Sequence, residues 1–314
     1  MRSTLILAPL RGLTDATFRN VYSSHFPGFD YAVAPFISTY QGNTVKPSLL
    51  KDLLPENNRK LKIIPQILSK DPEHFLNIAP ILADLGYDTV NWNLGCPYPM
   101  VAKKKRGSGL LPYPEAIASF LDKALNGPLA LSIKMRLGHK HPSEIFDLIP
   151  IFNQFPIVDI TIHPRTGIQM YKGHVDLETF EACLALSNHP VIYNGDITTP
   201  DGFNMLAEKF PSVAGWMIGR GALAHPFLPA CIKKLRLPGN HLHILASFHD
   251  ALFQSYCEKL SGPGHILGRM KGVWFYLCHS FRDSRKLLKK IQKTTRIEQY
   301  QYIVSSIWDT ENIA

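Results

Sequence analysis

With 314 residues, 45% of them hydrophobic and 19% charged, the chain can bury the core of a large globular domain and does not have the composition of a disordered protein. No uncharged apolar run approaches the roughly 18 residues that a membrane span needs, and five scattered cysteines without a C-x-x-C pair argue against disulfides and zinc. The formal net charge of +9 favours an anionic partner, and we expect a cytoplasmic, monomeric protein without a bound metal.

Short β-prone runs alternate with helical stretches through the first two thirds of the chain. The runs cover residues 5–7, 31–34, 63–68, 89–93, 130–135, 158–162, 191–193 and 216–218. Helix starts are marked by Asp71-Pro72-Glu73, Tyr113-Pro114-Glu115 and Thr199-Pro200-Asp201, each with proline at the first helical position. Eight alternations over about 220 residues predict an α/β fold of the (β/α)8 TIM-barrel type.

Pro238, Gly239 and Asn240 form the best candidate boundary within the chain. Beyond it the strand signal disappears, and apolar residues such as Ile244, Phe248 and Leu252 recur at helical spacing. We therefore expect a catalytic barrel domain over residues 1–237 and a smaller, all-helical domain over residues 241–314.

Two basic runs indicate what the anionic partner is. The first comprises Lys103, Lys104, Lys105 and Arg106; the second holds seven cations against one anion between residues 282 and 296. A helix would align Arg282, Lys286, Lys289, Lys293 and Arg296 on one face. A solvated helix face is the alternative for such a run, but the two runs together favour contacts with a nucleic acid.

Cys96 lies in the stretch Asn93-Leu94-Gly95-Cys96-Pro97, directly after a β-prone run. A strand that ends in such a turn exposes its side chain at the carboxyl edge of the sheet, where α/β proteins place their chemistry. Asn93 adds an amide that both donates and accepts hydrogen bonds. A buried structural cysteine is the alternative interpretation.

The other strand ends carry polar groups that packing does not require. They are the backbone of Ala8, Pro9 and Leu10, and the side chains of Gln66, Lys134, Arg136, His163, Arg165, Asn194, Asp196 and Arg220, with Gly219 opening a turn. Together they would surround one barrel mouth with cations, amides, an imidazole and a glycine turn that suits phosphate. This set predicts a planar cofactor with a phosphate tail, namely FMN, with Lys134 stabilising negative charge on its reduced ring.

Seven stretches of the chain, taken in order from residue 8 to 222, resemble the dihydrouridine synthases. They are Ala8-Pro9-Leu10-x-Gly12-x-Thr14-Asp15-x-x-Phe18-Arg19, Asn93-Leu94-Gly95-Cys96-Pro97, Gly107-Ser108-x-Leu110-Leu111, Lys134-Met135-Arg136-Leu137-Gly138, His163-x-Arg165-Thr166-x-x-Gln169-x-Tyr171-x-Gly173, Asn194-Gly195-Asp196-Ile197 and Met217-Ile218-Gly219-Arg220-Gly221. The C-terminal part is similar only in length, helical character and basicity.

The resemblance implies an FMN enzyme that uses NADPH to reduce the C5–C6 double bond of a uridine in tRNA. It implies hydride transfer to C6 and a proton from Cys96 to C5, which suits a thiol because its ordinary pKa of about 8.5 leaves it protonated at neutral pH. Asn93 would hold the uracil edge, and Arg136, Arg165 and Tyr171 would face the substrate. The flavin would be held by Gln66, Lys134, His163, Asn194, Asp196, Gly219 and Arg220.

Several positions depart from the family pattern. Arg11, Ala34-Pro35, Ser69, Asn91 and Pro164 stand where the family commonly has a small or acidic residue, a Thr-Glu pair, glycine, aspartate and glycine. One rival interpretation is an FMN barrel that reduces a free small molecule, of the dihydroorotate or enoate type. Another is a non-catalytic RNA-binding barrel.

Overall fold

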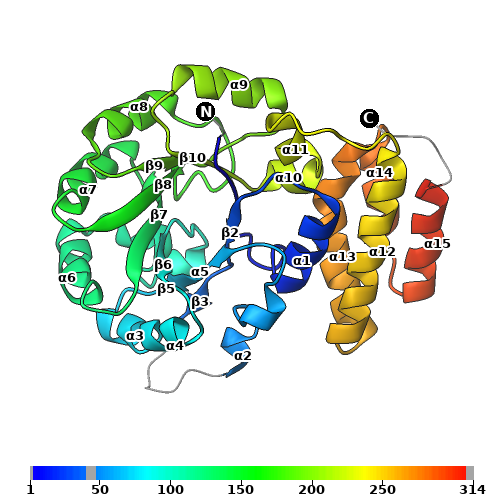
Figure 1. Cartoon of the computed structure of the whole chain (residues 1–314), viewed down its shortest axis with the longest axis horizontal. Helices are drawn as coiled ribbons and strands as arrows, with labels where there is room; N and C mark the ends of the chain where they lie inside the picture. Colours follow the sequence, from blue (N-terminus) through cyan, green and yellow to red (C-terminus); the bar gives the residue numbers. More distant parts are fainter. Residues whose placement is uncertain (1–2, 40–46, 309–314) are drawn as a thin grey trace.

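The computed structural model describes residues 3–39 and 47–308, and its centre is a barrel of parallel strands (Figure 1). The strands are β1 (Leu5–Leu7), β2 (Tyr31–Val33), β3 (Ile37–Ser38), β4 (Ile63–Ile64), β5 (Gln66–Leu68), β6 (Thr89–Leu94), β7 (Ala130–Gly138), β8 (Ile157–Thr166), β9 (Val191–Tyr193) and β10 (Gly215–Ile218). Their order in the sheet is β3-β5-β6-β7-β8-β9-β10-β1-β2-β4.

The sheet closes on itself at Pro65. This residue separates β4, which pairs with β2, from β5, which pairs with β3 and β6. Because proline lacks an N–H, it interrupts the ladder, but its carbonyl still accepts from Asn91 N at 2.8 Å. β4 and β5 are thus halves of one strand, as β2 and β3 are, and the ten segments form a ring of eight. The predicted (β/α)8 barrel is confirmed.

Helices follow the strands around the barrel. They are α1 (Ala16–His25), α2 (Pro47–Leu50), α3 (Pro72–Leu76), α4 (Ala79–Asp84), α5 (Pro99–Ala102), α6 (Pro114–Ala124), α7 (Ile145–Phe152), α8 (Leu177–Leu186), α9 (Pro200–Lys209), α10 (Arg220–Ala224) and α11 (Leu228–Ile232), with 3-10 turns at Pro55–Asn57, Gly107–Leu110, Pro142–Glu144 and Cys278–Ser280. Asp71 and Thr199 cap α3 and α9 as the sequence predicts, whereas Tyr113 makes no side-chain cap. Within residues 3–39 and 47–308, no helix has the length and apolarity to cross a membrane.

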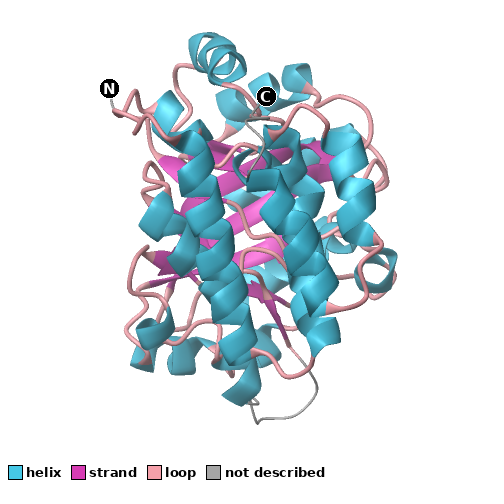
Figure 2. Ribbon diagram, turned by 90° about the vertical axis from the view of Figure 1, so that its right-hand side faces the viewer, coloured by secondary structure: helices cyan, strands magenta, loops and turns pink. Residues whose placement is uncertain are grey.

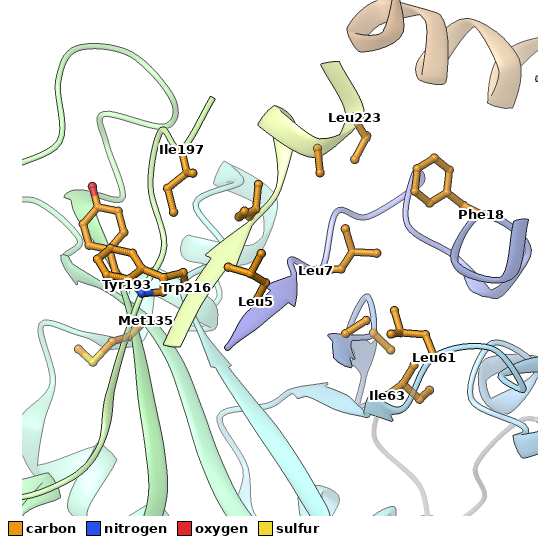
Figure 3. Packing of buried hydrophobic residues seen from close by; sticks show 14 of the residues in the cluster. Leu5, Leu7, Phe18, Leu61, Ile63, Met135, Tyr193, Ile197, Trp216 and Leu223 are labelled. Carbon is orange, nitrogen blue, oxygen red and sulfur yellow. The ribbon is translucent and has the colours of Figure 1, made fainter. Parts of the chain in front are cut away.

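The two faces of β1 belong to two different hydrophobic clusters, because side chains alternate along a strand. Ile6 points into the barrel with Val33, Ile192 and Met217. Leu5 and Leu7 belong to the large cluster between the strands and the surrounding helices, together with Tyr193, Trp216 and Leu223 (Figure 3). The barrel therefore has a filled interior, and only its ends are available for a ligand.

The C-terminal helices α12 (His241–Lys259), α13 (Pro263–Leu277), α14 (Ser284–Gln292) and α15 (Ile297–Trp308) stand together at one side of the barrel (Figures 1 and 2). The ring of Phe248 in α12 meets Phe26, which directly follows α1, edge-on at 5.0 Å between centroids. Nearby, the Tyr256 hydroxyl donates to Asp15 Oδ1 at 3.1 Å. The helical character expected after residue 240 is confirmed.

The predicted continuous helix over the basic run 282–296 is wrong at both ends. α14 begins at Ser284 and ends at Gln292, so Arg282 and Arg296 lie outside it and Lys293 is its C-cap residue. The helix ends here because Lys271 Nζ from α13 donates to the carbonyls of Gln292 and Thr294. The Thr294 hydroxyl also donates to the carbonyl of Ile291. Carbonyls that end a helix need such outside partners.

Candidate active site

A cavity of about 710 Å³ lies at the carboxyl ends of the barrel strands, within the size range of small-molecule sites. Most of the residues predicted for the site line it: Ala8, Pro9, Leu10, Asn93, Cys96, Lys134, Arg136, His163, Tyr171, Asn194, Asp196, Gly219 and Arg220. Two predicted residues, Gln66 and Arg165, do not line the cavity and are buried behind it.

The turn that carries Cys96 is held from both sides. Asn93 Oδ1 accepts from Gly95 N at 3.1 Å and from Cys96 N at 2.9 Å. The Cys96 carbonyl accepts from Ser108 N at 3.0 Å and from Ser108 Oγ at 3.1 Å. Gly107 has a φ of +55°, and a Cβ there would lie 2.7 Å from the Cys96 carbonyl oxygen. The position of the thiol is therefore fixed by its neighbours in the chain.

Burial raises the pKa of the Cys96 thiol above its ordinary value, although the cations Arg11 and Arg136 act in the opposite direction. A thiol with a raised pKa is protonated at neutral pH. Cys96 is only 7% exposed, but what surface it has faces the cavity. It is thus a buried cysteine whose small exposed surface forms part of the cavity wall.

A chain of buried amides crosses three neighbouring strands beneath this turn. Asn93 Nδ2 donates to Gln66 Oε1 at 2.7 Å, and Gln66 Nε2 donates to Asn91 Oδ1 at 2.8 Å. Asn91 Nδ2 in turn donates to Ser132 Oγ at 2.9 Å. Asn91 accepts from Gln66 and donates to Ser132, two roles that an amide can fill together, whereas the carboxylate that the family commonly has here could only accept. In this structure Gln66 acts through Asn93 and does not reach the cavity.

Lys134 places an amino group in the cavity wall without a carboxylate partner. Its Nζ donates to Asn194 Oδ1 at 2.6 Å, and Asn194 Nδ2 donates to the Met217 carbonyl at 2.8 Å. Burial, with a smaller contribution from the like charge of Arg136, lowers the pKa of Lys134 to about 7. A negatively charged ligand would reverse this shift, because an opposite charge favours the protonated form.

Two guanidinium groups hold the ring of Tyr171 at the edge of the cavity. Arg136 lies 5.4 Å and Arg220 lies 4.9 Å from the ring centroid. Arg136 is itself fixed, because its Nε donates to the Gly95 carbonyl at 3.0 Å and its Nη1 to the Thr166 carbonyl at 2.8 Å. The predicted substrate residues Arg136 and Tyr171 therefore form one unit that also contacts the Cys96 turn.

Arg165 is buried in an ion pair behind the cavity. Its two terminal nitrogens donate to the two carboxylate oxygens of Asp196, which also accepts from Arg220 at 2.9 Å. Arg165 Nη1 lies 3.2 Å from His163 Nε2. Burial and the surrounding cations lower the pKa of His163, so its ring is neutral at pH 7 and can accept this bond. Arg165 thus orients Asp196 and His163.

The loops after β9 and β10 approach each other closely at Gly221. A Cβ at this position would lie 2.0 Å from the Ile197 carbonyl oxygen, so only glycine fits. Arg220 extends from the same loop into the cavity lining. Among the described residues that line the cavity, Asp196 is the one carboxylate, whereas four basic residues line it: Arg11, Lys134, Arg136 and Arg220. The site is therefore positive, which fits a group with a phosphate or another negative charge.

Sequence reasoning missed several residues in the cavity wall, among them Phe36, Tyr98, His225, Phe275, Tyr276 and His279. Tyr98 comes two residues after Cys96, so its place in the same loop was a usable signal. Phe275 and Tyr276 belong to α13, and their position depends on how this helix packs against the barrel. No local pattern in the sequence shows that contact.

The predicted RNA-binding cations are mostly exposed, with one exception. Lys103, Lys104 and Lys105 are exposed, but Arg106 is partly buried and donates to the Thr39 carbonyl at 3.1 Å. The cations of the second run, Arg282, Lys286, Lys289, Lys293 and Arg296, are all exposed. Arg106 therefore anchors the first basic run to the end of β3.

Comparison with known proteins gives consistent matches over nearly the whole chain. The model of the dihydrouridine synthase (Dus) family matches residues 6–301. A probable tRNA-dihydrouridine synthase of Staphylococcus epidermidis is 32% identical, with 97% of this chain and 94% of that protein covered. tRNA-dihydrouridine synthase B of Shewanella oneidensis is 27% identical, with 96% and 95% covered.

Solved structures with a similar fold include a morphinone reductase mutant in complex with tetrahydroNAD. It has a TM-score of 0.53 and 11% sequence identity, with 78% of this chain and 90% of that chain covered. A variant of NCR from Zymomonas mobilis has a TM-score of 0.51 and 11% identity, with 77% and 90% covered. At this identity the likeness concerns the fold alone. The match of the family model from residue 6 to residue 301 shows that the chain belongs to the dihydrouridine synthase family.

Proposed function

We propose that the protein reduces the C5–C6 double bond of uridines in tRNA to give 5,6-dihydrouridine, with FMN as cofactor and NADPH as the source of electrons. The observation that carries this proposal is the position of Cys96. Its thiol is kept protonated by burial, and it lies in the wall of a positively charged cavity beside Arg11 and Arg136. Family membership supports the same reaction.

The cavity fits a flavin with a phosphate tail. The backbone of Ala8, Pro9 and Leu10 and the side chains of Lys134, His163, Asn194, Asp196 and Arg220 would hold it, with Gly219 in the turn beside them. Because its pKa is about 7, the Lys134 amino group would become more fully protonated as a negative charge came close to it. When bound, the flavin supplies the hydride that C6 of the uracil ring receives.

Cys96 supplies the proton for C5, so that a hydride and a proton are added across the double bond. The thiol becomes a thiolate in this step, and the cations Arg11 and Arg136 stabilise the charge that remains. Asn93 keeps the thiol directed at the cavity, because its side-chain oxygen binds the N–H groups of the turn. The second hydrogen on Asn93 Nδ2 is left for the uracil edge.

We assign catalysis to residues 1–237 and tRNA binding to the helices of residues 241–314. The exposed cations at 282, 286, 289, 293 and 296 would contact phosphates together with Lys103, Lys104 and Lys105. Such contacts offset the cost of extruding a base from its stack. A reductase of free small molecules would not need them.

The test is to incubate the protein with FMN, NADPH and an unmodified tRNA transcript and to measure dihydrouridine by mass spectrometry of the digested RNA. Free uridine and orotate serve as comparison substrates under the same conditions. We expect NADPH oxidation and dihydrouridine formation when tRNA is the substrate, and neither when free uridine or orotate replaces it. Faster NADPH oxidation with free uridine or orotate than with tRNA would contradict the proposal.

A further inference from the structure

Aromatic side chains surround the mouth of the cavity, although the proposed chemistry does not need most of them. Tyr98, Tyr171, Phe275 and Tyr276 all line it. Tyr98 follows Cys96 in the loop after β6, and Tyr171 lies in the loop after β8. Phe275 and Tyr276 come from α13 in the C-terminal helices. The aromatic rim thus draws on both the barrel and the helices beside it.

Two rings form the inner part of this rim, those of Tyr171 and Tyr276, and they lie near each other. Burial raises the pKa of Tyr276 and Arg220 opposes this, while the nearby hydroxyls of Tyr171 and Tyr98 add to the increase. Tyr171 is held by Arg136 and Arg220, and Tyr276 contacts Phe275 at 5.1 Å between ring centroids. Tyr171 is 40% exposed but is held by two guanidinium groups, and Tyr276 is partly buried, so these two rings form the walls of the mouth.

The two outer rings, those of Tyr98 and Phe275, are more exposed to solvent. Tyr98 is 54% exposed and Phe275 is 53% exposed, although both are large aromatic residues at the opening of a cavity. Met100, in the same loop as Tyr98, is 84% exposed and is followed by the exposed Lys103, Lys104 and Lys105. Exposed apolar surface beside a run of cations suits a ligand that alternates flat rings with phosphates.

We propose that Tyr98 and Phe275 form a stacking platform for the nucleobases on either side of the target uridine. The inference rests on the proposed function, because it takes a single-stranded RNA segment as the ligand of the cavity. When one base leaves a stack and enters the cavity, its two neighbours lose the surface that covered them. Exposed aromatic rings at the mouth replace that surface, and the lysines after Met100 meet the adjoining phosphates.

The platform has a consequence for substrate choice. Stacking on an aromatic ring is sequence-tolerant, because every base has a flat face, but a larger base covers more of the ring. The platform therefore favours uridines in unpaired loops with purine neighbours. It makes Tyr98 and Phe275 specificity-determining residues that do not touch the reacting atoms.

The test uses the complete protein and a fluorescein-labelled pentaribonucleotide, AAUAA, whose binding is measured by fluorescence anisotropy. A second oligonucleotide carries abasic sites on both sides of the uridine and keeps every phosphate. The variants are Tyr98→Leu and Phe275→Leu, which keep an apolar side chain but remove the ring. Phe146→Leu is the matched control, because Phe146 is 39% exposed on α7 away from the cavity. Circular dichroism checks that each variant is folded.

We expect the wild type to bind AAUAA roughly 5- to 100-fold more tightly than the abasic form, the range expected for stacking of bases on aromatic side chains. Each platform variant should lose much of this difference through weaker binding of AAUAA, with unchanged binding of the abasic form. Phe146→Leu should behave as the wild type. An unchanged difference in both platform variants, or an equal loss for the two oligonucleotides, would overturn the proposal.

Two further outcomes separate this inference from related ideas. If the variants raise the KM for NADPH and leave oligonucleotide binding unchanged, the rings serve the reductant, and the platform for bases is wrong. If the wild type forms no dihydrouridine in tRNA, the proposed function is wrong. The comparison of the two oligonucleotides still decides whether the rings stack bases, because it does not depend on turnover.

Discussion

Asn93 Oδ1 accepts a hydrogen bond from the backbone N–H of Cys96 at 2.9 Å, so the amide predicted to hold the substrate also fixes the turn that carries the thiol. The same side chain is held from below by Gln66, which is itself held by Asn91. Any change in this buried chain therefore reaches the active-site cysteine through one hydrogen bond. The first prediction follows from that coupling.

Asn93→Ala should leave the N–H groups of Gly95 and Cys96 without their partner and loosen the turn. A lost buried partner of this kind weakens the local structure by a factor of about 10 to 100. We expect kcat/KM for tRNA to fall at least that much, and Cys96 to react faster with iodoacetamide. Asn93→Asp retains the acceptor for these N–H groups but loses the donor to Gln66, so its labelling rate should lie between those of the wild type and Asn93→Ala. Equal labelling rates in Asn93→Ala and the wild type would contradict the positioning role.

Cys96→Ala should separate the two halves of the reaction. NADPH should still reduce bound flavin at the wild-type rate, while dihydrouridine formation should fall by about 10²- to 10⁴-fold, the usual contribution of a general acid. Burial raises the pKa of Cys96 above its ordinary value. We therefore expect the thiol to stay protonated between pH 7 and pH 9, so that ionisation of Cys96 does not lower turnover in this range. Cys257→Ala, in α12, is the control and should retain full turnover. Loss of flavin reduction in Cys96→Ala would instead indicate a structural cysteine.

Lys134→Met should make stability less dependent on pH. The folded pKa of Lys134 is about 7 against an ordinary 10.5, so between these values the unfolded chain holds a proton that the folded chain lacks. Stability from this group therefore rises with pH over that range. We expect Lys134→Met to raise the free energy of unfolding at pH 6 by up to about 5 kcal/mol, and the gain to shrink to about 1 kcal/mol at pH 10. Urea titrations at both pH values measure this.

The same substitution should weaken FMN binding. The wild type should take up a proton on binding FMN at pH 8, which calorimetry in two buffers of different ionisation enthalpy detects. Lys134→Met should bind FMN without that proton uptake. Identical affinity and proton uptake in the two proteins would show that Lys134 does not face the bound group.

Arg165→Met should mainly lower the stability of the fold, with little direct effect on substrate binding. Arg165 donates to Asp196 and to the carbonyls of Lys172 and Gly173. Since these groups lose a buried partner, we expect a loss of about 2–4 kcal/mol in the free energy of unfolding. Arg165→Lys should not restore it, because an ammonium group lacks the two-pronged geometry. The exposed Arg296, paired with Glu298 at 3.6 Å, gives the control Arg296→Met. Unchanged stability with a raised KM for tRNA would return Arg165 to a substrate role.

Replacing Lys286, Lys289 and Lys293 with glutamine should weaken tRNA binding and flatten its salt dependence. Each lost phosphate contact should reduce the slope of log K against log salt by about one unit. Flavin content should remain normal, because these side chains do not line the cavity. Lys62, Lys123 and Lys209, also exposed but on the barrel, give a triple variant with the same loss of charge. An equal effect of both triple variants on the slope would mean that α14 makes no specific contact.

The barrel was predictable because each strand is short, apolar and punctuated by turn residues, and all eight expected runs coincide with strands. The sequence shows a proline at position 65 within the third run. It does not show that the strand is divided there or that the ring closes at this point. For the site, reading the strand ends identified most of the cavity wall. It failed to separate Gln66 and Arg165, which support the wall, from residues that form it. Whether a polar side chain at a strand end points into the cavity or packs behind its wall depends on the three-dimensional arrangement, which the sequence pattern does not show.

The cavity takes part of its wall from α13, and this makes the proposed boundary at Pro238 a poor place to cut the chain. A fragment of residues 1–237 would expose Phe18 in α1 and Phe26 directly after it, because Phe248 of α12 packs against both rings. It would also lose Phe275 and Tyr276 and so leave the mouth of the cavity open to water. Grafting the helices of one relative onto the barrel of another would therefore change the reaction chamber together with RNA affinity, and chimeras should be designed around the α1–α12 contact as a unit.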